Sequence, residues 1–251
     1  MPYVKRTTKA GRTIENEKYY TSRYKKKGIK KGDKVKSTTE QQKKINTRQA
    51  ERRLRLSINE NFGTADYHLI LGYRHKRGDP YRSREEMRED MDIFLQQART
   101  EFKRIGLILK YIHVTEIGKR GARHHHLVIS KADPELFQLC WEHGRIRVFP
   151  LDDTGQYSKL ASYLIKYTEK TIGTDKAMMG KRWNSSKNLR KPEPEYEIIS
   201  DREWIRSEAK PIKGYYVDAD SVENGIHNPE YSGYGFFRYT LVKNPPGKEG
   251  G

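Results

Sequence analysis

The sequence lacks the residues that would cross-link the chain or carry it through a membrane. Its 251 residues include one cysteine, Cys140, so neither an intrachain disulfide nor a cysteine-based zinc site can form. No apolar run approaches the ~18 residues that a membrane-spanning helix needs, and the N-terminal MPYVKRTTKA lacks the apolar stretch of a signal peptide. We therefore expect a soluble protein of the reducing cytoplasm, with no membrane partner.

Hydrophobic residues are also scarce, at 34% of the chain, whereas 33% of the residues are charged. Lys and Arg outnumber Asp and Glu by 51 to 33, which gives a net charge of +18. Such a charge suits a polyanion, either a nucleic acid or an anionic membrane surface. Residues 1–55 hold 19 basic and 5 acidic side chains, so this segment carries most of the excess.

The basic N-terminal part divides into two segments. Residues 1–38 show no clear period and predict a disordered basic arm. Residues 39–61 contain no glycine or proline and predict an exposed basic helix, which either follows a phosphate backbone or is simply a solvated face. The candidate nucleic-acid-binding residues are Lys25, Lys26, Lys27, Lys30 and Lys31 in the arm, Arg48, Arg52, Arg53 and Arg55 in the helix, and Lys159 further along the chain.

Residues 62–190 predict a mixed α and β domain. The β-rich run YHLILGY at 67–73 precedes a helical stretch at 83–106, and strands at 107–118 and 124–130 follow as a hairpin. A helix is expected at 134–143, a strand at 145–150 and a second helix from 157 to about 171. Residues 191–251, with scattered prolines and two strand-like runs, predict a small β-rich C-terminal extension.

The sequence HHHLVIS at 124–130 is the first motif with chemistry. In a strand, alternate side chains share a face, so His124 and His126 lie together while His125 points to the opposite face. Two imidazoles about 7 Å apart along a strand can hold one divalent ion. Glu116 lies on the preceding strand, and a carboxylate in the ligand set would favour manganese or magnesium over zinc.

The second motif is YLIKYTEK at 163–170, in which Tyr-x-x-Lys occurs twice in succession. At ~100° per residue, one arc of a helix would carry the tyrosines and lysines while the opposite arc is apolar. Ammonium groups beside a phenol stabilise the phenolate and neutralise a phosphate. The arc contains Lys159, Tyr163, Lys166, Tyr167 and Lys170.

The order of these motifs, namely a hydrophobic strand, a Glu-bearing strand, a His-x-His strand and a Tyr-x-x-Lys helix, resembles the HUH endonucleases. The resemblance covers about residues 60–190 and is greatest to two-tyrosine rolling-circle replication initiators of Gram-positive mobile elements and small phages. It implies an α+β fold, with a central antiparallel sheet that carries the His-x-His strand and with the tyrosine helix packed on one face. The first family motif is represented only by LILGY, so no residue there is assigned.

Carried over by position, the resemblance implies that His124, His126 and Glu116 hold Mn²⁺ or Mg²⁺. It implies Tyr163 as nucleophile, Tyr167 as second nucleophile, and Lys166 and Lys170 as helpers. The implied reaction nicks single-stranded origin DNA, leaves a 5′-phosphotyrosine and frees a 3′-hydroxyl primer. The implied partners are the helicase and polymerase of a bacterial host cell, since the sequence has no Gly-x-x-x-x-Gly-Lys-Ser/Thr motif.

Three other functions remain open from the sequence. A conjugative relaxase and a single-strand transposase would share the chemistry. A third histidine, which most relaxases have in the metal cluster, is not evident here, and paired tyrosines are unlike many transposases. The alternative from another class is a non-catalytic nucleic-acid-binding protein, whose tyrosines stack on bases and whose lysines neutralise phosphates.

Overall fold

The structure is a computed structural model that describes residues 3–21, 40–75, 80–118, 121–169, 182–226 and 235–245. The chain forms two compact units. Unit 1 combines Met1–Lys44, Thr154–Gln156 and Lys191–Gly251, and unit 2 combines Ile45–Asp153 and Tyr157–Arg190. Each unit has its own sheet and is described by itself.

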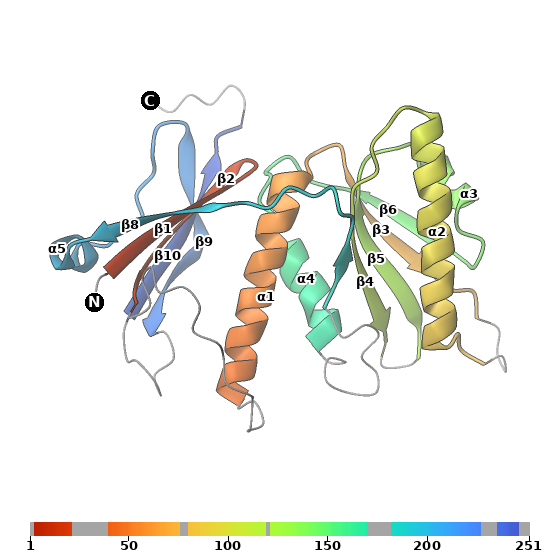
Figure 1. Ribbon diagram of the computed structural model, residues 1–251, viewed down its shortest axis with the longest axis horizontal. Helices are drawn as coiled ribbons and strands as arrows, with labels where there is room; N and C mark the ends of the chain where they lie inside the picture. Colours follow the sequence, from red (N-terminus) through yellow and green to blue (C-terminus); the bar gives the residue numbers. More distant parts are fainter. Residues whose placement is uncertain are drawn as a thin grey trace. The chain divides into compact units, whose positions relative to one another are not determined.

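The sheet of unit 2 has five antiparallel strands in the order β6-β3-β5-β4-β7. The strands are β3 (Tyr67–Gly72), β4 (Tyr111–Ile117), β5 (Arg123–Ile129), β6 (Ile146–Pro150) and β7 (Asn184–Ser185). Helices α1 (Glu40–Asn61) and α4 (Ser158–Glu169) pack on one face, and α2 (Arg84–Arg104) and α3 (Pro134–Leu139) on the other (Figure 1). The expected α+β fold, with the His-x-His strand in the sheet and the tyrosine helix on one face, is confirmed.

Strand alternation gives the two faces of this sheet separate cores. Leu69 and Leu71 of β3 and Leu127 and Ile129 of β5 pack with α2 and α3, among Phe94, Phe102 and Phe137. The alternate positions pack with α1 and α4, in a core that comprises Leu54, Ile58, Ile112, Val114, Val128, Leu164 and Ile165. Because β5 is buried on both faces, its polar side chains need partners on both.

Helix α1 belongs to the fold of unit 2 from Ile45 onward and is not a separate basic segment in front of it. Its residues Ala50, Leu54 and Ile58 are buried against β4 and α4, although the mean hydropathy of the helix is low. The expected domain boundary at residue 62 was thus too late, since unit 2 begins at Ile45. These three apolar residues recur at every fourth position and form a narrow buried stripe along the helix. The many charged residues around the stripe made the helix look fully exposed in the sequence.

The sheet of unit 1 also has five antiparallel strands, in the order β8-β1-β2-β10-β9. They are β1 (Tyr3–Ala10), β2 (Thr13–Tyr20), β8 (Pro194–Ile199), β9 (Tyr215–Ile226) and β10 (Gly235–Lys243), with the short helix α5 (Asp201–Ile205) after β8. The prediction of a disordered arm over residues 1–38 is wrong for residues 3–20, which form β1 and β2. The C-terminal region contributes β8, β9 and β10, which form one sheet with the N-terminal strands and not a separate extension.

Charge pairing explains why residues 3–20 fold despite their composition. Glu17 is 1% exposed and forms ion pairs with Arg6 of β1 and Arg238 of β10, the residues that lie opposite it in the two neighbouring strands. Lys5 similarly pairs with Glu197 of β8. The basic side chains of this segment thus pair with acidic residues, either within the β1–β2 hairpin, as Arg6 does, or from the other end of the chain, as Lys5 does. The lysines at 25, 26, 27, 30 and 31 lie outside the described residues.

Candidate nucleic-acid nicking site

The histidines of β5 alternate as the sequence predicts. His124 and His126 lie on the face of the sheet that α4 covers, and His125 lies on the face that α2 covers. His126 is 2% exposed and its Nε2 is 2.9 Å from Oε2 of Glu116. Nδ1 of His124 is 3.7 Å from the same oxygen. One carboxylate oxygen therefore contacts both imidazoles that the motif singles out.

Glu116 reaches this position through the register of the β4–β5 hairpin. It stands directly opposite His124, and Val114 stands opposite His126, so the carboxylate lies between the two histidines. Partial burial raises the pKa of Glu116, but hydrogen bonds and charge interactions with His124 and His126 prevail and hold its pKa at about 2. Glu116 is therefore an anionic oxygen donor beside two nitrogen donors at neutral pH.

His68 is a member of this cluster that the sequence did not reveal. It lies on β3, where Ile70 is the residue opposite His126, so His68, two residues before Ile70, is a diagonal neighbour of His126 on the same face. Its Nε2 is 3.3 Å from Nδ1 of His126, on the side of that ring opposite to Glu116. Burial, and the charge of His126 next to it, lower the pKa of His68 to about 4, so it is neutral.

Helix α4 brings two tyrosine rings onto the histidines. The Tyr167 ring stacks on the His126 ring at 4.9 Å and 11°, and the Tyr163 ring meets His126 edge-on at 5.7 Å. Tyr163 also contacts His68 edge-on at 5.9 Å. Ala161, Leu164 and Ile165 bury the opposite arc of the helix, as the helical period predicts.

The two tyrosines differ in environment. The Tyr163 side chain is 39% exposed, whereas Tyr167 is half-buried between Tyr163 and His126. Burial, then the hydrogen bond with Tyr163, then the charge of Glu116 raise the pKa of Tyr167 above that of free tyrosine. Lys159 and Lys166 are exposed, and Lys170 lies outside the described residues. Tyr163 is thus the more accessible of the two phenols.

The donor chemistry of Glu116, His124 and His126 fits a divalent cation. One carboxylate oxygen and two imidazoles are a set that manganese accepts. In the arrangement described, Glu116 and His126 are hydrogen-bonded directly to each other at 2.9 Å. As the side chains stand, however, no group of three or more His, Cys, Asp or Glu among the described residues is arranged to hold a metal. Binding would have to replace the direct Glu116–His126 contact.

A buried polar chain lies on the other face of β5. The Tyr73 hydroxyl is 2.9 Å from Nε2 of His125, and Nδ1 of His125 is 2.9 Å from Nε2 of His113. The Thr115 hydroxyl is within 3.3 Å of both histidines. His125 and His113 are buried, and burial followed by neighbouring histidine charges lowers both pKa values, to about 3 for His113. These contacts satisfy the polar groups of β5 within the α2 core.

Because both buried histidines are neutral when folded, we expect acid to destabilise unit 2. The unfolded chain binds protons at each histidine below pH ~6.5, whereas the folded pKa values lie lower, so stability is complete above pH ~6.5 and falls as the pH drops. The loss should be about 1.4 kcal/mol per pH unit for each histidine well below pH 6.5. Urea unfolding, followed by the fluorescence of Trp141 beside His125, measures it.

The matched variant for this prediction is His113→Gln, which keeps a polar side chain beside His125 but removes one titrating group. Its slope of stability against pH between 6 and 4.5 should be shallower than that of the wild type by roughly the contribution of one histidine. An unchanged slope would mean that His113 does not titrate on unfolding in this range.

The four arginines of α1 differ in exposure. Arg48 and Arg53 are exposed, as a helix that follows a phosphate backbone requires. Arg52 and Arg55 are only 9% and 8% exposed, so the prediction that they face nucleic acid from an exposed helix is wrong. Their positions fall beside the apolar stripe, where a long side chain covers apolar surface with its methylenes.

The sequence also predicts that no helix crosses a membrane. Among the helices of the described ranges, none combines the length and the apolar character that crossing a membrane requires.

Residues 62–172 match the family model REP_ORF2-G2P, replication-associated protein ORF2/G2P. The matched range runs from the residues before β3 to the end of α4, so it contains the histidines, Glu116 and both tyrosines. No curated protein and no solved structure matches the chain. The match to REP_ORF2-G2P supports a replication-associated (Rep) protein that acts on DNA.

Proposed function

We propose that the protein is a rolling-circle replication initiator of the HUH type, which nicks and rejoins single-stranded origin DNA through a tyrosine. The observation that supports this most is the convergence of three separate elements at one place. Glu116 of β4, His124 and His126 of β5, and Tyr163 and Tyr167 of α4 contact one another on one face of the sheet. The partly exposed Tyr163 gives this cluster a nucleophile that a strand of DNA can reach.

In the proposed reaction, the Tyr163 oxygen forms a bond to a phosphorus of the DNA strand. The bond between that phosphorus and the 3′-oxygen breaks, the phenolic proton passes to solvent and the released 3′-oxygen takes up a proton. The product is a 5′-phosphotyrosine and a free 3′-hydroxyl, and reversal by another 3′-hydroxyl rejoins a strand. Lys166, one helical turn from Tyr163, adds positive charge where the phosphate approaches.

Tyr167 is the proposed second nucleophile. Its burial and its raised pKa make the free phenolate less accessible than that of Tyr163 in the arrangement described. An alternating use of the two tyrosines would therefore require Tyr163 to act first. Lys170, three residues after Tyr167 in the sequence, is the proposed second helper.

The proposed metal is Mn²⁺ or Mg²⁺, held by Glu116, His124 and His126. A bound divalent ion would polarise the scissile phosphate and offset the charge that develops on the leaving oxygen. His68 would orient the ring of His126 from its other nitrogen, as hydrogen-bonded neighbours of metal ligands commonly do. Because His68 and Glu116 approach His126 from opposite sides, His68 is proposed as a residue that orients His126 and not as a metal ligand.

The proposed setting is the cytoplasm of a bacterial cell that carries a mobile element. The 3′-hydroxyl requires a DNA polymerase to extend it and a helicase to displace the old strand, so both host enzymes are proposed partners. Arg48 and Arg53 of α1, Lys159, and the lysines between residues 25 and 31 would contact the phosphates of the origin.

The test is a covalent adduct with DNA. Single strands that tile the sequence around the protein's own coding region, labelled at the 3′ end, are incubated with the protein and manganese and separated in SDS. We expect one strand to give an SDS-stable shift that needs the metal, since tyrosine retains the 3′-terminal fragment. The same strand labelled at the 5′ end should give a shortened fragment that a DNA polymerase extends.

If the tiled strands bind but none forms an adduct with manganese or magnesium, the proposed chemistry is wrong. The protein would then be a non-catalytic nucleic-acid-binding protein. An adduct with the label on the 5′ fragment would show that the tyrosine takes the 3′-phosphate, contrary to the proposed polarity.

A further inference from the structure

Strand β6 forms one edge of the unit 2 sheet, and its two faces differ. Ile146 and Val148 pack against the core that α2 and α3 cover. The alternate side chains, Phe149, Arg147 and, just before the strand, Arg145, lie on the opposite face, which is also that of the proposed nicking site. All three are exposed, and Phe149 keeps 46% of its surface accessible. An apolar ring on the solvent side of an edge strand is a surface that another molecule can cover.

The Phe149 ring lies beside the proposed nucleophile. Phe149 stands opposite His68 of β3, and the two rings are 6.0 Å apart with 32° between their planes. His68 in turn meets the Tyr163 ring edge-on at 5.9 Å. Within the described residues, no second ring contacts Phe149 and no cation lies over it. Its exposed face is therefore available for stacking, at one residue's remove from Tyr163.

Arg147 is aligned with His126 across the sheet. It stands opposite Ile70 of β3, and Ile70 stands opposite His126 of β5. Because neighbouring strands lie ~4.8 Å apart, this row spans about 10 Å from one backbone to the other. The side chains of Arg147 and Arg145 form no hydrogen bond or ion pair in the described part of the chain, so their charges are not offset.

Arg145 is aligned in the same way with His124. Its carbonyl accepts a hydrogen bond from the Gly72 amide at 2.9 Å, and Gly72 stands opposite His124. A Cβ on Gly72 would lie 3.4 Å from Cδ2 of His124, so the glycine leaves this row without a side chain between Arg145 and His124. A strand of DNA that follows β6 is thus one row from each proposed histidine ligand.

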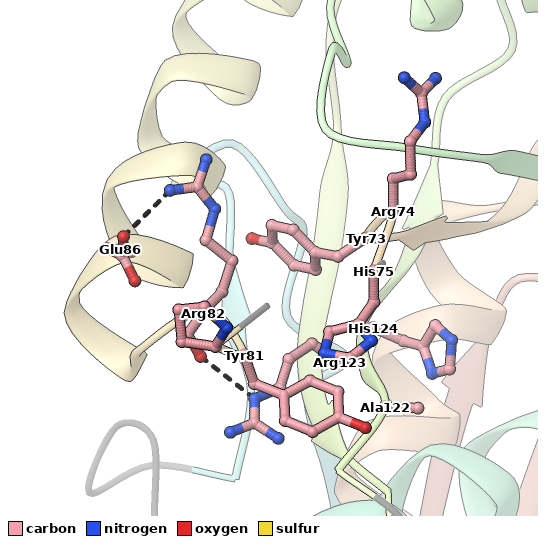
Figure 2. A pocket seen from close by; sticks show the side chains of 10 residues that line it. Tyr73, Arg74, His75, Tyr81, Arg82, Glu86, Ala122, Arg123 and His124 are labelled. Atoms are coloured by element: carbon pink, nitrogen blue, oxygen red, sulfur yellow. Dashed lines mark hydrogen bonds and ion pairs between the residues drawn. The ribbon is translucent and has the colours of Figure 1, made fainter. Parts of the chain in front are cut away.

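The arginines of β6 differ from two arginines that line a pocket of about 500 Å³ beside His124 (Figure 2). There, Arg82 forms an ion pair with Glu86 at 3.0 Å, and the Arg123 guanidinium carbon lies 4.8 Å from the centroid of the Tyr81 ring. Both guanidinium groups are engaged within the fold. The cations available to a ligand on the face of the nicking site are therefore those of β6.

We propose that the exposed face of β6 binds the single-stranded DNA next to the scissile phosphate, with a base stacked on Phe149 and phosphates paired with Arg145 and Arg147. An aromatic face for the bases and basic side chains for the backbone are the two elements by which proteins hold single strands. The β6 face thus guides the strand to Tyr163. This inference rests on the proposed function, because it assumes that the bound strand is the one that is cut.

The experiment measures binding of the full chain without cleavage, by fluorescence anisotropy with no added metal. The probes are labelled (dT)12 and a 12-mer of the same backbone in which every nucleotide is abasic. Phe149→Ala should weaken binding of (dT)12 about tenfold and leave binding of the abasic strand unchanged, because only stacking is lost. Phe149→Trp, which keeps an aromatic face, should bind both probes at least as tightly as the wild type.

Arg145→Gln and Arg147→Gln should each weaken binding of both probes, because both probes have phosphates. Each variant should also make the slope of log affinity against log salt concentration shallower by about 0.7, the contribution of one phosphate contact in a single strand. Arg104→Gln is the matched control, since it removes an exposed guanidinium from α2 on the other face of the sheet. It should leave the slope unchanged.

The matched control for the ring is Tyr196→Ala, which removes an aromatic residue of 50% exposure from β8, an edge strand of the other sheet. Tyr196 lies between Glu195 and Glu197 rather than beside arginines, so neither affinity should change. If thermal unfolding shows that Phe149→Ala is destabilised, Phe149→Leu replaces it, because leucine keeps an apolar contact with His68 without an aromatic face.

Equal affinities of the wild type and the Ala or Leu variant for (dT)12 would overturn the proposal. So would an equal loss for both probes, or no binding of (dT)12 by the wild type. Unchanged affinities together with a dimer that Phe149→Ala dissociates would make this face an interface between two copies of the chain instead.

These outcomes are separable from those of the adduct test. If the binding pattern is as expected but no strand gives an adduct, the single-strand site on β6 stands and the nicking chemistry fails. If an adduct forms and Phe149→Ala binds (dT)12 normally, the chemistry stands and the β6 site fails.

Discussion

Tyr163→Phe is expected to reduce the covalent DNA adduct by at least about 10³-fold, since it removes the oxygen that is proposed as the nucleophile. The phenylalanine ring keeps the edge-on contacts with His126 and His68, so the fold and the affinity for single strands should stay near wild type. Quantifying the SDS-stable band against time, at saturating manganese, gives the rate. Anisotropy with the same strand confirms that binding is intact.

Tyr167→Phe is the matched variant, because it removes the same atom one turn along the same helix. It should slow formation of the first adduct by less than about tenfold, and its main effect should be on rejoining. If Tyr167→Phe abolishes the first adduct while Tyr163→Phe does not, the order of the two tyrosines is the reverse of the one proposed.

His126→Ala is expected to lower manganese-dependent nicking by about 100-fold or more. The substitution removes the imidazole that contacts Glu116 at 2.9 Å, His68 at 3.3 Å and the Tyr167 ring at 4.9 Å, so it removes the centre of the cluster. A titration of nicking rate against manganese should show both a lower maximum and a weaker dependence on the metal, because a nitrogen donor of the proposed set is missing.

Two neighbours of His126 serve as controls. His68→Gln should weaken the apparent manganese affinity by about tenfold to 100-fold, as is typical when a residue that orients a ligand is removed. His125→Gln should lower the stability of the fold and leave the manganese titration close to wild type, because its side chain lies on the opposite face with Tyr73 and His113. Loss of the metal response in His125→Gln with an intact fold would contradict the assigned faces.

The residues that sequence reasoning placed well were those whose roles depend on local periodicity. Alternation along β5 separates His125 from His124 and His126, and the helical period of α4 separates the tyrosines from Leu164 and Ile165. Both patterns act within a few residues, so no tertiary information was needed. The position of Glu116 could also be predicted, because β4 and β5 follow each other in the sequence and pair as a hairpin.

The residues that it missed depend on pairings between distant segments. His68 joins the cluster only because β3 pairs with β5, nearly 60 residues later in the chain, and a lone histidine in YHLILGY carries no sign of that register. The same reason applies to β1 and β2. Their apolar residues are few, and the acidic partners of their basic side chains are partly at the other end of the chain, as with Lys5 and Glu197. The composition of residues 3–20 therefore predicted a disordered segment, although these residues form β1 and β2.

The strand order of unit 1 has a consequence for synthesis of the protein. The first two strands lie in the interior of the sheet, between β8 on one side and β10 on the other, so three of the five strands must be translated last. Unit 2 is nearly contiguous from Ile45 to Arg190, so it can fold on the ribosome before β8 and β10, the strands that pair with the β1–β2 hairpin, have been translated. Stop codons introduced after residue 191 should thus yield a chain in which unit 2 is folded and the N-terminal hairpin is open to proteases. Removing residues 1–38 would likewise take out two interior strands, and the remaining strands would be left with unpaired edges.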